Sequence, residues 1–393
     1  MENGNGRLGG REVVIVEAVR TPIGRGHPEK GYYKGLHPSN LLAKVYTELI
    51  ERSGIDPLEV GDVIAGCVSQ FGEQQLNIGR NAWLEAGLPV EVPATTIDRQ
   101  CGSAQQAVNF AAALIASGVH DVVIGGGVEH MGHLPFAAGA KVMEEFGLAF
   151  SPQLLERYDL VPQGISAEMI ADKWEISRRE LDEIGLRSQQ LAQRATEEGR
   201  FEREIVPMQV NGETYVTDQG LRETSLEALA DLRPAFKEDG KITAGNSSQV
   251  SDGAAAVLLM AREKADELGL RPRARIFDQT TVGVDPVIML TGPIPATRKL
   301  LERNGMTIDD IDLIEINEAF ASVVAAWQRE LEPDMERVNV NGGAIALGHP
   351  LGSTGARLIA TLLHEMERAD KEMGLVTMCC GGGLGTGTLI QRV

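Results

Sequence analysis

Two cysteines and one histidine of this 393-residue chain stand in glycine-rich turns that lie far apart in the sequence. Cys101 comes just before a predicted helix, and Cys379 closes a predicted strand in front of three glycines. His349 lies between them in a turn of small residues. A nucleophilic thiol and one or more groups that move protons are the parts of an acyl-transfer site. No CxxC spacing is present, which argues against a zinc or redox motif.

The position of Cys101 before a helix predicts an activated thiol. A helix N-terminus carries partial positive charge, which lowers the pKa of a thiol and favours the thiolate. Gly102, the next residue, permits a sharp turn and the close approach of a ligand. The alternative is a buried structural cysteine, which is the usual fate of this residue type.

His349 and Cys379 are the candidate proton carriers. Histidine titrates near neutrality and can accept the proton of a thiol, although a turn histidine can also simply bond to the backbone. The glycines after Cys379 offer bare N–H groups for an oxyanion hole. Cys380 has the opposite strand parity, so we expect it to pack in the core, a vicinal disulfide being rare. Cys67 ends a predicted strand and is also expected in the core.

Two polar turns offer further functional groups. Asn317 and Glu318 follow the predicted strand Ile311–Ile316. Asn317 can hold a water or an oxyanion, or it can cap the next helix with Glu318 in the first turn, and these roles are compatible. The polar turn Gly245–Gly253 precedes the predicted strand Ala254–Met260. It is either an ordinary loop or a set of donors and acceptors for an amide-rich ligand.

Composition restricts the class of protein. Hydrophobic residues make up 43% and charged residues 24%, values typical of a soluble globular chain, here with two or three cores. No apolar run approaches the roughly 18 residues of a membrane span. The polar start, Met1–Arg11, lacks the apolar segment of a signal peptide and is expected to be a frayed tail. Four cysteines without a disulfide pattern point to a reducing cytoplasm.

The formal net charge of −19 argues against general binding to nucleic acids or anionic membranes, because their phosphates would be repelled. A single phosphate-bearing ligand held by a local basic patch remains compatible with this charge.

Strands and helices alternate in the first third of the chain, and this order predicts an α/β fold with helices on a largely parallel sheet. The predicted strands are Glu12–Ala18, Asp62–Val68, Ala94–Ile97 and Asp121–Gly127, and the predicted helices are Asn40–Arg52 and Gly102–Ser117.

The second half of the sequence repeats features of the first. Gly54–Ile64 is similar to Gly305–Ile314, and each is followed by a glycine-rich turn, a long helix and a strand, Gly374–Met378 in the second case. This similarity predicts an internal duplication into two α/β halves with sheets related by pseudo-symmetry. The charged middle, 129–247 with its predicted helix Arg178–Glu198, interrupts the pattern. It is either a surface insertion or a lid over a site between the halves.

Four motifs together resemble the thiolase family, the acyl-CoA C-acyltransferases, over nearly the whole chain. They are Gly126–Met131, Asn317–Ala321, Val338–Pro350 and Cys379–Gly383. The resemblance implies a five-layered α-β-α-β-α thiolase fold of two duplicated βαβαβαββ halves with an inserted loop domain. The implied domains are 1–128 with approximately 248–270 as the N-terminal half, 129–247 as the loop domain and 271–393 as the C-terminal half.

The resemblance also implies roles for single residues. Cys101 is similar to the nucleophile that takes the acyl group, His349 to the base that activates it, and Cys379 to the acid/base that acts on carbon. Asn317 is similar to the residue whose water forms one oxyanion hole with His349. The N–H groups of Cys101 and Gly381 are similar to a second oxyanion hole. The removal of one such donor typically costs about 3–4 kcal/mol.

Substrate contacts follow from the same resemblance. Ser248, Ala319 and Phe320 match positions along the pantetheine channel, and Arg222 is a weaker match to a residue near the adenine. Coenzyme A is then a substrate, with no metal and no permanently bound cofactor. CoA thioesters are the expected partners, and a homodimer or homotetramer is the expected assembly.

The implied reaction is a reversible ping-pong cleavage of 3-ketoacyl-CoA by CoA into acetyl-CoA and a shortened acyl-CoA. Biosynthetic thiolases carry a loop-domain histidine where this chain has Val161–Gly164, and Gly245–Gly253 looks more like the degradative members. The stretch Ile316–Val323 together with Glu332–Met335 resembles actinobacterial thiolases of lipid and steroid side-chain breakdown. These features favour a degradative enzyme, as in fatty acid beta-oxidation or steroid degradation, that accepts a bulky or longer acyl part.

Three other functions are considered. A biosynthetic acetoacetyl-CoA thiolase would use the same active site in the opposite direction. A decarboxylating ketoacyl synthase shares the fold but lacks the late catalytic cysteine, so Cys379 argues against it. A non-catalytic thiolase-like lipid carrier tends to lose a catalytic residue, whereas this chain has all of those matched.

Overall fold

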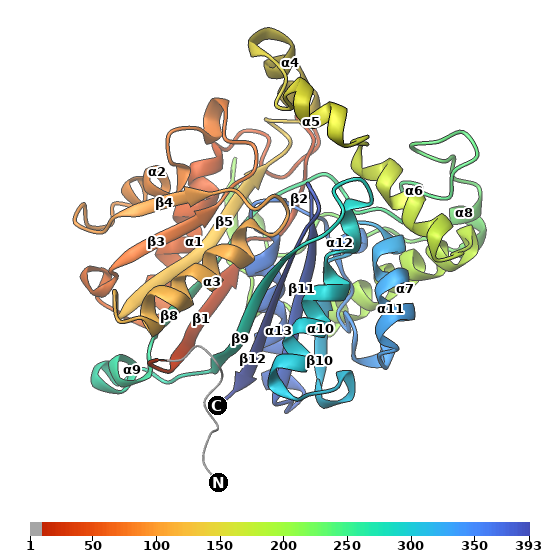
Figure 1. Ribbon diagram of the computed structural model, residues 1–393. Coiled ribbons are helices and arrows are strands. Elements are labelled where there is room, and N and C mark those ends of the chain that lie inside the picture. Colours follow the sequence, from red (N-terminus) through yellow and green to blue (C-terminus); the bar gives the residue numbers. More distant parts are fainter. Residues whose placement is uncertain (1–9) are drawn as a thin grey trace.

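The computed structural model describes residues 10–393, so the expected tail Met1–Arg11 lies almost entirely outside the described residues. Two similar sets of strands and helices form most of the molecule, and a long middle segment lies against them (Figure 1). Within the described part of the chain, no helix is long and apolar enough to cross a membrane.

The first set of elements comprises β1 (Val13–Arg20), β2 (Gly24–Arg25), α1 (Pro38–Ser53), β3 (Asp62–Gly66), α2 (Ile78–Glu85), β4 (Ala94–Ile97), α3 (Ser103–Ala116), β5 (Val122–His130) and β8 (Ser251–Ala261). After α9 (Arg262–Leu268), the second set comprises β9 (Ala274–Gly283), α10 (Pro293–Asn304), β10 (Leu313–Ile316), α11 (Ala321–Leu331), α12 (Ala344–Leu347), α13 (Thr354–Arg368), β11 (Met373–Cys380) and β12 (Leu384–Arg392). The middle segment holds α4 (Phe136–Phe146), α5 (Pro152–Arg157), α6 (Gln163–Lys173), α7 (Arg178–Glu197), β6 (Met208–Val210), β7 (Glu213–Tyr215) and α8 (Leu226–Ala230). The strands and helices predicted from the sequence are confirmed, with ends that differ by a few residues.

The order of strands confirms the duplication. The ten-stranded sheet runs β10-β11-β12-β9-β1-β8-β5-β3-β4, with β2 added beside β8. Read outward from its centre, β1-β8-β5-β3 in one half corresponds to β9-β12-β11-β10 in the other. The outermost β4 is matched by an isolated bridge between Ile314 and Val338. The halves meet where β1 pairs with β9 through Val14 and Ile15 alone.

The prediction of a largely parallel sheet is wrong. Among the described strands of this sheet, β3 runs parallel to β4 and β5, and β10 runs parallel to β11. All the pairs that involve β1, β8, β9 or β12 are antiparallel. Each half ends on an antiparallel strand that returns beside its first strand. The βαβα pattern at the start of a half does not reveal this return.

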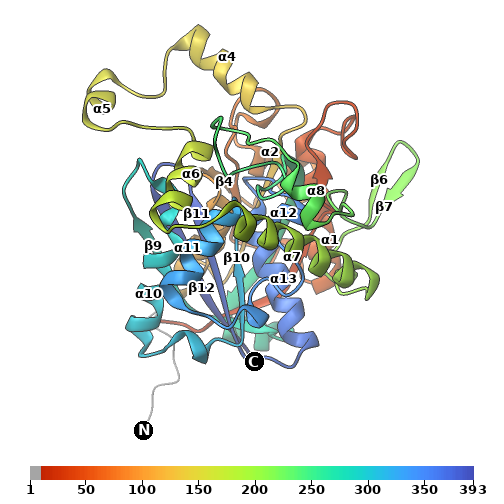
Figure 2. The ribbon, with the colours of Figure 1, turned by 90° about the vertical axis from the view of Figure 1, so that its right-hand side faces the viewer.

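Five layers result from this arrangement, as expected for the fold; they lie side by side in Figure 1, whereas Figure 2 looks onto α6, α7 and α11. Helices α3 and α13 contact each other and lie between the two half-sheets. Helices α1 and α2 cover the outer face of the first half-sheet, and α10 and α11 lie outside the second. The small residues of α3, such as Ala104, Ala107 and Ala111, are fully buried and permit close packing of the central layer.

The middle segment lies between β5 and β8 in the sequence. Its helices α6 and α7 pack on α11, and α7 also packs on α12. By contrast, α4 and α5 project from the top of the molecule in Figure 1 and are exposed along most of their length. The segment is therefore partly an integral layer on the second half and partly a projecting arm.

Candidate active site

The turn before α3 holds Cys101 at the centre of the molecule. Cys101 is 2% exposed, and Gly102 is the N-cap residue of α3. The hydroxyl of Ser103, the first residue of the helix, accepts from the N–H of Arg99 and donates to the carbonyl of Gln100. Ser103 therefore fixes the turn that presents the thiol.

The turn that carries His349 is pressed against this same helix start. A Cβ on Gly66 would lie 2.6 Å from both the carbonyl oxygen of Gly352 and the backbone nitrogen of Ala104. A Cβ on Gly127 would lie 2.0 Å from that carbonyl oxygen. Glu129 accepts from the N–H of Gly352 at 2.9 Å and ties the turn to the end of β5. Glycine at these positions lets the two turns meet.

The hydrogen bonds of His349 determine which of its nitrogens is basic. Its Nδ1 lies 2.6 Å from the hydroxyl of Thr354, and that hydroxyl donates to the carbonyl of Pro350 at 2.8 Å. Because the hydroxyl proton is already used, Thr354 accepts the proton of Nδ1. Nε2 is therefore the unprotonated nitrogen, and it lies 3.3 Å from Nδ2 of Asn317.

Asn317 is fully buried at the end of β10, where its N–H donates to the carbonyl of Thr377 on β11. Its Oδ1 has no hydrogen-bond partner among residues 10–393 and can accept one more donor, such as a water. The expectation that Asn317 caps a helix is wrong, because α11 begins only at Ala321. Glu318 is likewise outside that helix and accepts from the side chains of Ser188 and Asn339.

Gly381 and both late cysteines border Cys101. The N–H groups of Gly381 and of Cys101 itself lower the pKa of the Cys101 thiol, and the Cys379 thiol lies close enough to interact with it electrostatically. A Cβ on Gly102 would lie 2.6 Å from the Cys380 sulfur, and the N–H of Gly102 lowers the pKa of that thiol. Cys380 thus packs behind the turn, as expected, while the Cys379 thiol lies near Cys101.

The charge states differ from those that the sequence suggested. Burial raises the pKa of the Cys101 thiol to about 11, although the N–H groups of Gly381 and Cys101 oppose the shift. Burial also raises the pKa of Cys379 well above its usual value. Burial and, second, the charge of Arg357 lower the pKa of His349 to about 3. Desolvation thus outweighs the helix N-terminus. With these shifts the thiol and the imidazole are both neutral at rest, so an attack by Cys101 would require proton transfer in the same step.

Three residues expected to line a substrate channel lie together. The N–H of Ser248 donates to the carbonyl of Ala319 at 3.0 Å, and Ser247 forms a bridge with Phe320. The Phe320 ring meets that of Phe236 edge-on, with 5.9 Å between centroids. The polar turn before β8 and the segment before α11 therefore form one wall.

Arg222 lies apart from the thiols and faces a second arginine that the sequence did not single out. Burial of its stem and, second, the charge of Arg25 lower the pKa of Arg222. Within residues 10–393, neither arginine forms an ion pair. The backbone N–H of Arg25 donates to the side chain of Gln219, and that of Arg222 donates to the side chain of Gln189. This pair is a concentration of positive charge on a strongly acidic protein.

The middle segment also reaches the thiols. A Cβ on Gly381 would lie 2.8 Å from the amide nitrogen of Gln163, the first residue of α6. The ring of Phe236 packs on the backbone of Gly164 and keeps the start of α6 in place. Gln163 stands within the Val161–Gly164 stretch, where the sequence indicated a missing histidine contact. A lid over the site would make this kind of contact between Gln163 and Gly381, and the lid role of the middle segment stays a prediction.

Several residues of the site were missed at the level of sequence. Thr354 and Glu129 orient the histidine turn, Gln163 covers Gly381, and Arg25 adds a second positive charge. Thr354 could have been found, because it lies five residues after His349 at the start of a predicted helix. The others act across long sequence separations, which no local pattern reveals.

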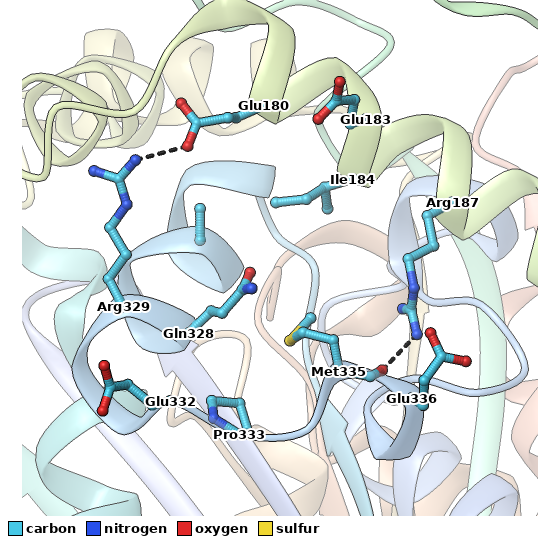
Figure 3. A pocket seen from close by; sticks show the side chains of 11 residues that line it. Glu180, Glu183, Ile184, Arg187, Gln328, Arg329, Glu332, Pro333, Met335 and Glu336 are labelled. Atoms are coloured by element: carbon cyan, nitrogen blue, oxygen red, sulfur yellow. Dashed lines mark hydrogen bonds and ion pairs between the residues drawn. The ribbon is translucent and has the colours of Figure 1, made fainter.

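A separate groove of about 730 Å³ lies between α7 and α11 (Figure 3). Glu180 pairs with Arg329 at 2.7 Å, and Arg187 donates to the carbonyl of Met335 at 2.6 Å. None of the expected site residues lines it. Glu332 and Met335 belong to the stretch that resembles steroid-degrading thiolases. They therefore line the groove between α7 and α11 and not the candidate active site.

All four cysteines lie within the described residues and are free. The described residues contain no group of three or more His, Cys, Asp or Glu that could hold a metal ion.

Comparisons with known proteins agree with this geometry. The family model for the N-terminal domain of thiolase matches residues 13–263, and the model for the C-terminal domain matches 270–392. The steroid 3-ketoacyl-CoA thiolase FadA6 of Mycobacterium tuberculosis is 48% identical over 97% of this chain and 94% of its own length. An acetyl-CoA acetyltransferase of Syntrophomonas wolfei is 46% identical over 98% of this chain and all of its own length. The crystal structure of the Bacillus anthracis acetyl-CoA acetyltransferase superposes with a TM-score of 0.88 at 40% identity, over 99% of this chain and 100% of that one. The chain belongs to the thiolase family and is an enzyme of the thiolase type.

Proposed function

We propose that this enzyme cleaves 3-ketoacyl-CoA with CoA, through an acyl group carried on Cys101. The observation that supports this most directly is the meeting of three turns. The Cys101 thiol lies against the Gly381 N–H and the Cys379 thiol, while the His349–Asn317 pair is pressed to the same helix start.

In the first half-reaction, Nε2 of His349 takes the proton of Cys101 as the sulfur attacks carbon 3 of the substrate. The N–H groups of Cys101 and Gly381 then stabilise the oxyanion on that carbon. The bond between carbons 2 and 3 breaks and leaves the acyl group on Cys101. The departing enolate oxygen faces His349 and Asn317, and Cys379 donates its proton to carbon 2 to give acetyl-CoA.

In the second half-reaction, the Cys379 thiolate takes the proton of an incoming CoA thiol. The CoA sulfur attacks the thioester carbon on Cys101, and the same N–H groups hold the oxyanion. When the intermediate collapses, the Cys101 sulfur leaves and regains its proton from His349. The shortened acyl-CoA is released and every group returns to its starting state.

Coenzyme A is the substrate that fits the remaining contacts. The wall of Ser248, Ala319 and Phe320 offers a narrow polar and apolar surface for pantetheine. Arg222 and Arg25 carry positive charge to which phosphates of CoA can bind, despite the formal net charge of −19. No metal or permanently bound cofactor takes part in the proposed reaction.

We favour a degradative role with a bulky or longer acyl part. The relatives named above include a steroid 3-ketoacyl-CoA thiolase, and a 3-ketoacyl-CoA thiolase of Aliivibrio salmonicida is 45% identical over 97% of this chain. Gln163 stands where biosynthetic thiolases present their histidine stretch. The second candidate, a biosynthetic acetoacetyl-CoA thiolase, draws support from the acetyl-CoA acetyltransferases among the similar proteins.

The projecting arm supports a homo-oligomer, either a dimer or a tetramer. Large apolar side chains of α4, α5 and the segment between them are exposed: Phe136, Val142, Met143, Phe146, Leu148, Phe150, Leu154 and Leu155. Such a concentration usually marks a protein interface, and we assign it to a second copy of the chain. Light scattering should give a dimer or tetramer, and a monomer at micromolar concentration would contradict the assignment.

The buried, free thiols of the site require a reducing compartment, so we place the enzyme in the cytoplasm.

A panel of 3-ketoacyl-CoA thioesters tests the proposed function. We expect CoA-dependent thiolysis of acetoacetyl-CoA, followed at its enolate absorbance. We also expect kcat/KM at least about tenfold higher for long linear or steroid side-chain substrates, because added apolar contacts favour them. The Cys101→Ala variant should form no acyl-enzyme. The highest value for acetoacetyl-CoA would instead favour the biosynthetic role. The absence of turnover with every thioester would favour the carrier.

A further inference from the structure

Arg357 is a fully buried cation with unusual surroundings. It is 1% exposed, and none of its three guanidinium nitrogens has a hydrogen-bond partner among residues 10–393. Glu315, itself 2% exposed, lies 3.7 Å from it, which is beyond hydrogen-bond distance, and burial raises the pKa of this carboxyl to about 8. A buried arginine is normally held by several direct bonds. This one interacts with its neighbours mainly through its charge.

The pair lies on the same two elements that hold the hydrogen-bond partners of His349. Glu315 and Asn317 are two residues apart along β10 and its end, so they face the same side of the sheet. Thr354 and Arg357 are three residues apart on α13, so they share one face of that helix. Strand and helix are in contact. β10 and α13 thus carry both the partners of His349 and the Arg357–Glu315 pair.

The other charges around this pair come from five segments and have their own partners. Arg20 of β1 bonds to Glu204 and Asp218. Glu318 accepts from Ser188, Asn339 and the N–H of Ile345, and Glu365 of α13 bonds to Arg368 and Asn341. These groups act on Arg357 or Glu315. Arg357 is the charged group whose field acts on the imidazole of His349.

We propose that Arg357 is a positioning residue that acts on His349 by charge, keeping the imidazole unprotonated until the Cys101 proton arrives. The inference rests on the base role proposed for His349. A nearby cation disfavours a second positive charge on the imidazole. It also favours return of the proton to the leaving thiolate at the end of the cycle.

The sign of the expected pH effect follows from this. Protonation of His349 abolishes its role as base, so kcat/KM falls on the acid side as the imidazole takes up a proton. Arg357 adds to burial in lowering the pKa of His349. Removal of the cation should raise that pKa, and the acid limb of the profile should move to higher pH.

The test compares variants that keep the cation with variants that lose it. Arg357→Lys and Glu315→Gln keep it, and Arg357→Met loses it. The double variant Arg357→Met with Glu315→Gln also loses it without leaving a buried carboxylate unpaired, which protects the test from loss of folding. The readout is the pH profile of kcat/KM for acetoacetyl-CoA thiolysis, with near-UV circular dichroism to confirm folding.

We expect the acid limb of both cation-free variants to move upward by about half a pH unit or more relative to Arg357→Lys. Equal limbs in Arg357→Lys, Arg357→Met and the double variant would overturn the inference, even if all lose activity, because that result describes a purely structural residue. Failure of the wild-type enzyme to turn over any 3-ketoacyl-CoA would instead overturn the proposed function.

Discussion

The turn before α3 and the turn before α13 occupy equivalent places in the two halves, yet the first presents a thiol and the second an imidazole. Each helix opens with a hydroxyl residue that fixes its turn. Ser103 donates to the carbonyl of Gln100, and Thr354 donates to that of Pro350. Of these two hydroxyls, only that of Thr354 also accepts from Nδ1 of the histidine, His349. Duplication therefore supplied two similar turns, and their side chains took on complementary roles.

The strand ends show a larger difference. In the first half, β5 leads into the long middle segment before β8 returns. In the second half, β11 and β12 are joined by the short turn Gly381–Gly383, which brings Cys379 and the Gly381 N–H to Cys101. One half thus places a long segment with a projecting arm at this position, whereas the other places the proposed catalytic groups there. In the proposed mechanism the second half consequently contributes most of the proton chemistry.

The adjacent cysteines of the tight turn offer the strongest way to break this comparison. Cys379→Ala should still form an acyl-enzyme on Cys101 but lose carbon–carbon bond exchange by about 10²–10⁴-fold, because the acid/base for carbon is gone. Cys380→Ala should remain within a few-fold of wild type, since its thiol packs behind Gly102. Intact-mass detection of the acyl adduct and thiolysis rates measure the two steps separately. A Cys379→Ala enzyme with normal exchange would remove the catalytic role of the second-half turn.

Much of the fold could be predicted from the sequence because the halves repeat their local signals. The predicted strand Ala94–Ile97 and the predicted helix Arg178–Glu198 begin at the same residues as β4 and α7. The antiparallel return of β8 could not be predicted, since it depends on pairing across the middle segment. Cys101, His349 and Cys379 could be singled out from the sequence because each stands in a glycine-rich turn.

The charge states of the site could not be predicted for a different reason. The sequence shows that Cys101 precedes a helix, but it does not show how deeply the thiol is buried. Burial dominates its pKa and that of His349. Long-range partners such as Gln163 and Arg357 depend on how the layers pack, and local periodicity carries no information about that packing.

The two hydroxyl residues give the smaller and sharper prediction. Thr354→Val keeps the shape of the side chain but removes the acceptor of the Nδ1 proton, so the imidazole loses its fixed orientation and tautomer. We expect kcat/KM for thiolysis to fall by about tenfold, a typical cost for loss of a residue that orients a functional histidine. Thr354→Ser keeps the hydroxyl and should retain most of the activity.

The equivalent Ser103→Ala should lower the free energy of unfolding by about 1 kcal/mol, the usual net value of one hydrogen bond, with a smaller effect on the pH profile. Denaturant unfolding and pH-dependent kinetics on the same preparations separate the two effects. Equal losses of stability and activity in Thr354→Val and Ser103→Ala would show that the hydroxyls of both halves serve only to hold their turns.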